Sequence, residues 1–368
     1  MTEVPAVFIC IFSFVGAARA ADKTSERVLY VADKTGLSLY DIDHGHTFMR
    51  QIAVPDSGDY KGIAVSPQLG RLYLTSYKKD ELISLDLSTD AVVWRKRLGG
   101  YGDSMMITPD GQRLYVPYRD EDNWKVVDAK DGGRLASIKT EHGKDYDVNP
   151  IYGVGPHNTW INPEGSRVYM SILTVPYIYV ADTRTNEVIG KIGPFGKGIR
   201  PFTVSNDEKY LYANVDELLG FEIAEIHKGD RWSGSVVQRI EAHTPASRLA
   251  DFPNPPTRIP HNTPSHGINL RPDQKEVWIV DGVYGYVYAY DVKATPPKLV
   301  ASIALNKDPQ DRPRPGWMSF SLDGKYAYPD GGAVIDTATK KIVARIPTSE
   351  KLLEIDFQNG KPIRAGHR

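Results

Sequence analysis

Short apolar runs that end at turn residues follow one another along most of this chain. One phrase recurs: an apolar strand that ends at Pro or a similar residue, a tight polar turn, and a second strand with an aromatic residue near its centre. Gly62–Pro67 is followed by Arg71–Leu74, and Ser104–Pro109 is followed by Arg113–Val116. A strand, a tight turn and a second strand in this order predict a β-hairpin.

The phrase has four further copies, and each hairpin precedes a third strand that ends at an acid and then a fourth strand. The further copies begin at Asn158, Pro201, Gly267 and Trp317. The acids are Asp41, Asp86, Asp128, Asp182, Asp291 and Asp336, with Glu222 in the one irregular copy. Four antiparallel strands that recur at intervals of roughly 40 to 65 residues are typical of the blades of a β-propeller.

The two ends of the chain supply a seventh blade. Val28–Val31 has no apolar partner strand before it, whereas Leu352–Phe357 matches the repeated first strand. Pairing of these segments closes the ring and removes exposed sheet edges. An open two-sheet sandwich, the alternative all-β fold, predicts no such complementarity between the termini. We predict one all-β domain over residues 21–368, a seven-bladed β-propeller whose C-terminal strand completes the N-terminal blade.

The first twenty residues differ from the rest of the chain. The apolar run Ala6–Val15 is followed by a small-x-small triplet that ends at Ala20, which is typical of a secretory signal peptide. Glu3 departs from the positive charge usual at the start of a signal, and a buried N-terminal strand is the alternative. The single cysteine, Cys10, lies in this segment, so we expect a mature chain without thiol chemistry, located in the periplasm or outside the cell.

The overall charge narrows the choice of partners. A formal net charge of −1 provides no long-range attraction to nucleic acid or to an anionic membrane. Beyond the first twenty residues, no stretch of sequence is long and apolar enough to span a bilayer. We therefore expect a small-molecule or glycan ligand rather than nucleic acid, and no membrane span.

Polar residues converge where the first strand of each blade enters the central channel. We call this end of the ring the top face. The residue six places before each repeated Pro-like position is predicted to lie at the channel mouth. These residues are Lys61, Asp103, His157, Arg200, His266 and Gly316, with Leu352 in the closing strand. Unpaired buried charge is costly, so a binding site and a ring of ion pairs around a solvent-filled channel are the two interpretations.

Long insertions favour the binding site. The three longest connections are predicted to project from the top face, where loops on a rigid scaffold commonly bind ligands. They span Glu141–Pro156, Ala242–Ser265 and Asn306–Pro315. The Pro-rich part of the second, Phe252–Pro260, is predicted to form a stiff wall or lid.

Two of these connections lead into the same tetrapeptide, Pro-His-Asn-Thr, at Pro156–Thr159 and Pro260–Thr263. With His266, these copies bring three imidazoles, those of His157, His261 and His266, to one side of the channel. Three histidines and a carboxylate suit a divalent transition metal; without a metal, neutral histidines act as hydrogen-bond donors or bases. The remaining histidines in turns or at the chain end are predicted to be solvated: His44, His46, His227 and His367.

The repeated phrases resemble those of the YVTN-repeat, YncE-like seven-bladed propellers, whose architecture is related to that of lactonase-type propellers. The resemblance rests on Ser66-Pro67, on Thr108–Gly111 and on Leu114–Val116, and it covers nearly the whole mature chain. It implies the fold but not one activity. Such propeller groups include lactone hydrolases, polysaccharide lyases, metal-dependent oxidases and noncatalytic surface-binding proteins.

Two classes of function remain open. In the first, the site is an enzyme, a lyase or lactonase, for an acidic small molecule or uronate-containing oligosaccharide. Arg200 and Lys61, together with Arg258, hold the carboxylate, while His157 or His266 supplies general base and acid. Tyr101 and Tyr146 are candidate proton relays. The predicted ligand contacts are completed by Asp103, His261 and Trp317.

In the second class, the protein is a noncatalytic binding propeller of the cell envelope that uses the same top face. A metal-dependent oxidoreductase with histidine ligands is a further alternative. The sequence does not distinguish these functions, and it leaves the substrate, the metal and the oligomeric state open.

Overall fold

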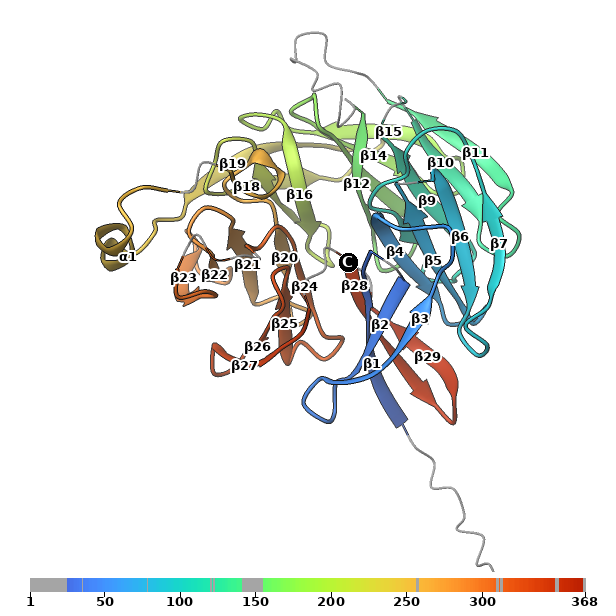
Figure 1. Ribbon diagram of the computed structural model, residues 1–368. Helices are drawn as coiled ribbons and strands as arrows, with labels where there is room; N and C mark the ends of the chain where they lie inside the picture. The colour runs from blue at the N-terminus through green and yellow to red at the C-terminus, as the bar shows by residue number, and fades with distance from the viewer. Residues whose placement is uncertain are drawn as a thin grey trace, which may run out of the picture.

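The structure is a computed structural model with seven antiparallel sheets arranged around a common centre (Figure 1). It describes residues 25–34, 36–77, 79–119, 121, 123–140, 155–255, 258–308, 311, 314–347 and 351–366. The predicted signal segment, residues 1–20, lies outside the described residues. The fold is the predicted seven-bladed, all-β propeller.

Six blades each come from one continuous stretch of chain, and the first strand of each lies nearest the channel. Their sheets contain the following strands: β4 (Tyr60–Ser66), β5 (Arg71–Ser76), β6 (Glu81–Asp86) and β7 (Val92–Lys96); β8 (Met106–Ile107), β9 (Arg113–Tyr118), β10 (Asn123–Asp128) and β11 (Arg134–Lys139); β12 (Pro156–Ile161), β13 (Arg167–Ile172), β14 (Ile178–Asp182) and β15 (Glu187–Ile192); β16 (Ile199–Val204), β17 (Tyr210–Val215), β18 (Gly220–His227) and β19 (Ser233–Glu241); β20 (Ile268–Leu270), β21 (Glu276–Asp281), β22 (Tyr286–Asp291) and β23 (Lys298–Ala304); β24 (Met318–Phe320), β25 (Tyr326–Pro329), β26 (Ala333–Asp336) and β27 (Lys341–Arg345).

The seventh blade joins the two ends of the chain, as predicted. Strand β28 (Lys351–Gln358) pairs with β1 (Ser25–Ala32), followed by β2 (Gly36–Asp41) and β3 (Thr47–Ala53). In Figure 1 the red β28 lies beside the blue strands of this blade, next to β1. A fifth strand, β29 (Lys361–Ala365), pairs with the other edge of β28 and was not predicted, because it is short and has no apolar alternation.

Charged and polar side chains join this closing blade to the blade before it, at a contact that we call the seam. The Arg27 guanidinium donates to Glu354 at 2.8 Å and lies 3.0 Å from an Asp323 carboxylate oxygen. The second Glu354 carboxylate oxygen accepts the Leu322 N–H at 2.7 Å. His46 is hydrogen-bonded to the Tyr328 hydroxyl at 2.9 Å. His46 is thus buried, and the prediction that it is solvated was wrong.

The aromatic residue of each second strand packs inside the blades. Tyr73, for example, is fully buried, and its hydroxyl donates to the Ala129 carbonyl of the next blade at 2.8 Å. The predicted acids end the third strands, with one exception. Arg71 and Tyr210 each begin the second strand of their blade. Arg71 pairs with Asp86 and Tyr210 pairs with Glu225, so the equivalent acid is Glu225 rather than Glu222.

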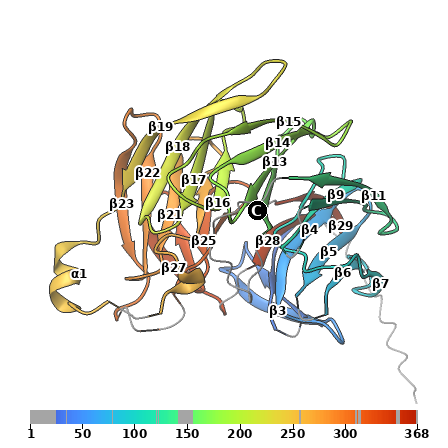
Figure 2. The ribbon, with the colours of Figure 1, turned by 90° about the horizontal axis from the view of Figure 1, so that it is seen from above.

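The second insertion carries the one described α-helix, α1 (Ala246–Asp251), and the short 3-10 helix η1 (Pro260–Asn262). In both ribbon views α1 lies outside the ring beside β23 (Figures 1 and 2). Among the described residues, no helix has the length and apolar character needed to cross a bilayer.

Candidate active site at the channel mouth

The strand register brings the predicted mouth residues to one level of the ring. Continuing the first-strand pairings of each blade toward the top face puts six of them at the same level: Lys61, Asp103, His157, Arg200, His266 and Gly316. We call them the mouth ring. The β-strand register shifts at Lys61, His157 and Arg200. Such bulges change the direction of side chains and are common beside active sites.

The closing strand departs from the predicted count by two residues. Leu352 pairs with Val31 in the register in which Ile63 pairs with Leu74 in its own blade. Ile63 lies two residues below Lys61, so Leu352 likewise lies two residues below the ring. The ring position is residue 350, which lies outside the described residues. The level directly below the ring consists of Gly62, Ser104, Asn158, Pro201, Gly267, Trp317 and Lys351.

The three predicted histidines form a cluster with Trp317. The rings of His261 and His266 are stacked with their centroids 4.0 Å apart and their planes at 14°. His157 lies 5.6 Å from His266, and Trp317 meets His266 edge-on at 4.6 Å. His157 and His266 expose only 3% and 2% of their surfaces. The structure thus brings together one residue from an insertion, His261, and residues from three blades.

His261 reaches the ring because Gly316 leaves space for it. A Cβ atom at residue 316 would lie 2.7 Å from the His261 ring, too close for any contact. His261 itself has a positive φ of 55°, and Pro260 before it packs near Gly282. The His261 ring therefore occupies the space that a side chain at position 316 would fill.

His266 is held neutral with one nitrogen fixed. Its Nδ1 lies 2.9 Å from the Gly316 carbonyl oxygen, which accepts only, so Nδ1 carries the proton and Nε2 keeps its lone pair. Burial holds the pKa of His266 well below its usual value, and His261, His157 and the positive charge of Arg200 act in the same direction. At neutral pH this side chain is an unprotonated base.

His157 forms a polar chain with its neighbours. The Asn158 amide nitrogen lies 2.5 Å from His157 Nδ1, which assigns the proton to Nε2. That nitrogen faces Asp103 Oδ2 at 3.8 Å, and Arg119 Nε approaches the same oxygen at 3.5 Å. Asp103 is almost fully buried. Neither Asn158 nor Arg119 was predicted, because neither occupies the repeated mouth position.

Lys351 is the most important residue that the sequence count missed. Its side chain is 1% exposed, its ammonium lies 3.7 Å from the centroid of the Trp317 ring, and it donates to Ser104 Oγ at 3.4 Å. Ser104 in turn donates to Asp103 at 3.0 Å. The ammonium group and the aromatic face form a cation–π contact. A lysine directly before the two leucines that begin the predicted closing strand was the available signal.

The other two predicted cations of the mouth ring are each paired with a carboxylate. Lys61 pairs with Asp59 at 3.2 Å, and Arg200 donates through Nε to Asp216. Their side chains are about one fifth exposed, at 21% and 19%. They are the mouth-ring cations that solvent reaches.

Three predicted residues are not placed in the cluster. Tyr101, predicted as a proton relay, instead stacks on Tyr77. Tyr146 lies outside the described residues, as does most of its insertion. Arg258 has an exposed side chain, and its carbonyl oxygen accepts a hydrogen bond from the Arg314 guanidinium. Arg248 and Arg314 lie in the insertions and donate to the backbone carbonyls of Asn306 and Gly282. In the described part of the chain, no contact joins Arg258 to the histidines.

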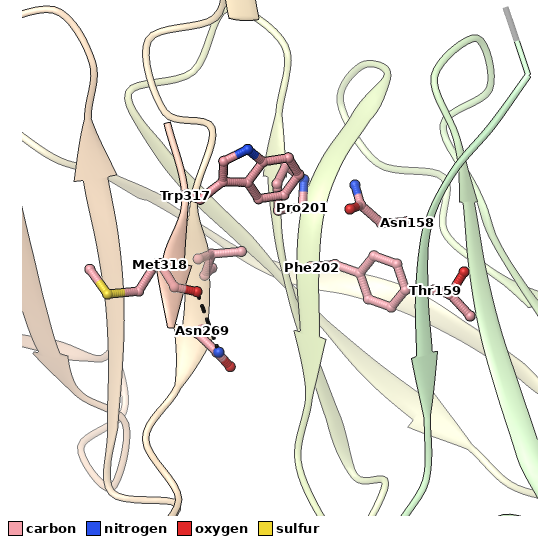
Figure 3. Close-up of a pocket in the computed structure, with 8 residues that line it drawn as sticks. Asn158, Thr159, Pro201, Phe202, Asn269, Trp317 and Met318 are labelled. Atoms are coloured by element: carbon pink, nitrogen blue, oxygen red, sulfur yellow. Dashed lines mark hydrogen bonds between the residues drawn. The ribbon is translucent and has the colours of Figure 1, made fainter. Parts of the chain in front are cut away.

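Directly below the ring lies a small cavity of about 30 Å³, enough for one or two waters. Figure 3 shows Trp317 and Met318 on one side of it, Pro201 and Phe202 behind, and Asn158 and Thr159 on the other. A ligand larger than water does not fit in this cavity.

The cluster does not have the geometry of a metal centre. Within the described ranges, no group of three or more His, Cys, Asp or Glu side chains is arranged to hold a metal ion. The planes of His261 and His266 are nearly parallel, so their nitrogens do not converge on one point. The site fits acid–base chemistry better than metal ligation.

Comparison with known proteins supports the fold. No family model matches the chain. The seven-bladed beta-propeller protein Rv1057 of Mycobacterium tuberculosis is 28% identical over 145 residues, which is 39% of this chain and 33% of that protein. The matched stretch thus spans about a third of the curated relative's length.

Solved structures cover more of the chain at lower identity. The periplasmic gluconolactonase PpgL of Pseudomonas aeruginosa has a TM-score of 0.65 and 13% identity, over 93% of this chain and 99% of that one. A protein from Lactobacillus plantarum has a TM-score of 0.67 and 13% identity, over 89% and 99%. Hydrazine synthase of Kuenenia stuttgartiensis has 0.59 and 16%, over 88% and 93%. At these identities the likeness shows the propeller fold alone.

Proposed function

We propose that the channel mouth is the active site of a hydrolase for a lactone of an acidic sugar, in a protein of the periplasm or the extracellular space. One observation carries this proposal: neutral His266, with its Nδ1 proton fixed on Gly316, lies beside the buried His157–Asp103 pair. A positioned neutral imidazole is the side chain most often used as a general base.

The reaction needs three groups, and the mouth provides a candidate for each. Nε2 of His266 takes a proton from water as the water oxygen bonds to the lactone carbonyl carbon. Lys61 and Arg200 supply positive charge for the oxyanion that develops, and later for the product carboxylate. The ring C–O bond then breaks, and the His266 imidazolium returns its proton to the leaving alkoxide. The product is the open hydroxy acid.

His157 positions and polarises the site in this scheme. Asn158 and Asp103 fix the orientation of its ring, and Asp103 is itself balanced by Arg119. The fold likeness to a gluconolactonase is consistent with this chemistry but identifies no residue.

Noncatalytic binding of the same acidic ligands is the second candidate. It is favoured by the burial of His266, whose 2% exposure leaves a substrate little access to the proposed base. In that case the cations bind the ligand and the histidines only complete the packing of the mouth.

A hydrolysis assay on the full mature chain tests the proposal. D-glucono-1,5-lactone and D-glucaro-1,4-lactone are followed by proton release at constant pH, with the spontaneous rate subtracted. His157→Ala is compared with His227→Ala, which removes an exposed histidine at the end of β18. We expect turnover that His157→Ala lowers at least tenfold and His227→Ala leaves unchanged.

The same panel separates the alternatives. Turnover that both variants leave equal to wild type contradicts the site assignment. No turnover, combined with calorimetric binding that depends on Lys61 and Arg200, supports the noncatalytic function. New ultraviolet absorbance from a uronate-containing glycan indicates a lyase instead.

A further inference from the structure

An aromatic pair lies beside the mouth ring and has no part in the acid–base scheme. The rings of Tyr77 and Tyr101 are stacked, with centroids 4.5 Å apart and planes at 27°. Tyr101 is 41% exposed, although most large aromatic residues of this chain are buried inside blades. One tyrosine therefore covers the other and leaves aromatic surface open to the top face.

Backbone contacts hold this pair in place. The Tyr101 carbonyl accepts the Arg119 N–H at 3.1 Å, and the Tyr77 N–H donates to the Asp59 carbonyl at 3.0 Å. Buried Lys125 donates to the carbonyls of Leu98 and Gly99, both at 2.5 Å, and so fixes the loop that leads to Tyr101. A surface that is ordered before binding loses little entropy when a ligand arrives.

The pair adjoins the charged residues of the site. Asp59, which anchors Tyr77, also pairs with Lys61 at 3.2 Å, and Arg119, which anchors Tyr101, approaches Asp103 at 3.5 Å. The charges of Arg119, Asp103 and Lys61 all act on the Tyr77 hydroxyl. Open aromatic surface thus continues directly into the cationic edge of the mouth.

We propose that Tyr77 and Tyr101 form a stacking platform for a neutral sugar ring, next to the subsite for the acidic unit. The C–H groups on one face of a pyranose are apolar and pack on aromatic surface, while its hydroxyls remain in water. The preferred ligand is therefore an acidic disaccharide or longer oligosaccharide rather than a monosaccharide acid. This inference rests on the proposed function for the acidic unit.

Calorimetric titration of the full mature chain with two stable acids tests the platform. Gluconate occupies only the acidic subsite, whereas cellobionate carries the same acid and one additional glucose ring. Wild type is compared with Tyr101→Ala, with Tyr101→Phe, which keeps the ring, and with Phe48→Ala. Phe48 is a matched control because it is 60% exposed on β3, away from the mouth.

We expect Tyr101→Ala to weaken cellobionate binding about tenfold and gluconate binding less than about twofold. Tyr101→Phe and Phe48→Ala should both retain wild-type affinity for cellobionate. Equal losses for the two acids, or no loss for either, overturn the platform. Wild-type binding of neither acid overturns it as well.

The two proposals fail separately. Because both acids are already open, their binding does not require hydrolysis. If Tyr101→Ala weakens cellobionate binding but wild type does not hydrolyse the lactones, the platform is supported and the hydrolase is rejected. If wild type hydrolyses the lactones but Tyr101→Ala does not change cellobionate binding, the hydrolase is supported and the platform is rejected.

Discussion

The channel mouth and the seam contain the same kinds of residue in two different roles. Each has a buried histidine whose pKa is lowered by burial, and each has an arginine bonded to a carboxylate. At the seam, His46 is bonded to Tyr328 and packs edge-on against Tyr326 at 4.8 Å. At the mouth, His266 keeps Nε2 as an acceptor and belongs to a cluster that borders the top face.

The comparison shows that a perturbed pKa does not by itself identify a functional histidine. The seam residues join β1 and β28 to the preceding blade, and their polar groups form hydrogen bonds with other groups of the protein rather than with a ligand. The mouth residues come from separate blades and meet only because the ring positions converge. Three experiments test this distinction.

The arginines should give the largest contrast. Arg27→Gln leaves the buried Glu354 carboxylate without its cation, and we expect it to lower the free energy of unfolding by about 3 kcal/mol. Arg200→Gln removes a pair that solvent reaches, so we expect a loss of about 1 kcal/mol or less. It should instead raise the KM for D-glucaro-1,4-lactone about tenfold. Urea unfolding and steady-state kinetics measure the two effects, and equal loss of stability would contradict the distinction.

The histidines should separate in activity. We expect His266→Gln to lower kcat/KM for the lactone about 100-fold, since it removes the general base, while His46→Gln changes it less than about twofold. Both variants are assayed well below their melting temperatures. A comparable loss in His46→Gln would show that the seam takes part in the chemistry.

The smallest effect concerns the pH dependence of stability. Burial, with the charge of Arg27 as a further cause, lowers the pKa of His46 to about 4. Between pH 4 and about 6.5 the unfolded chain therefore binds a proton that the folded protein does not, and stability rises with pH across this window. Across this window we expect the free energy of unfolding of His46→Gln to rise less than that of wild type, by on the order of 2 kcal/mol.

Thermal unfolding of wild type and His46→Gln at several pH values between 4 and 7 measures this slope. His44→Gln is the matched control, because His44 has a side chain that is 78% exposed two residues earlier. A slope that His46→Gln leaves unchanged contradicts the neutral, buried state of His46.

Counting six residues back from the repeated turn predicted the six mouth-ring positions, because in those blades the same number of first-strand residues lies between the turn and the channel mouth. It failed in the closing blade, where β28 continues to Gln358 to pair with β29. Lys351 was missed for this reason. Tyr77, Asn158 and Arg119 were missed because they contact the site from outside the repeated position.

The sequence by itself determined the repeated hairpins, the ring closed by its own ends and the level at which polar residues meet, since period-two alternation and turn residues act locally. Only the tertiary structure decided which of those residues touch. His261 fills the space that Gly316 leaves, and Lys351 lies over Trp317, through contacts between segments far apart in the chain. Side-chain packing at the channel, rather than the repeat, selects which polar positions form a site.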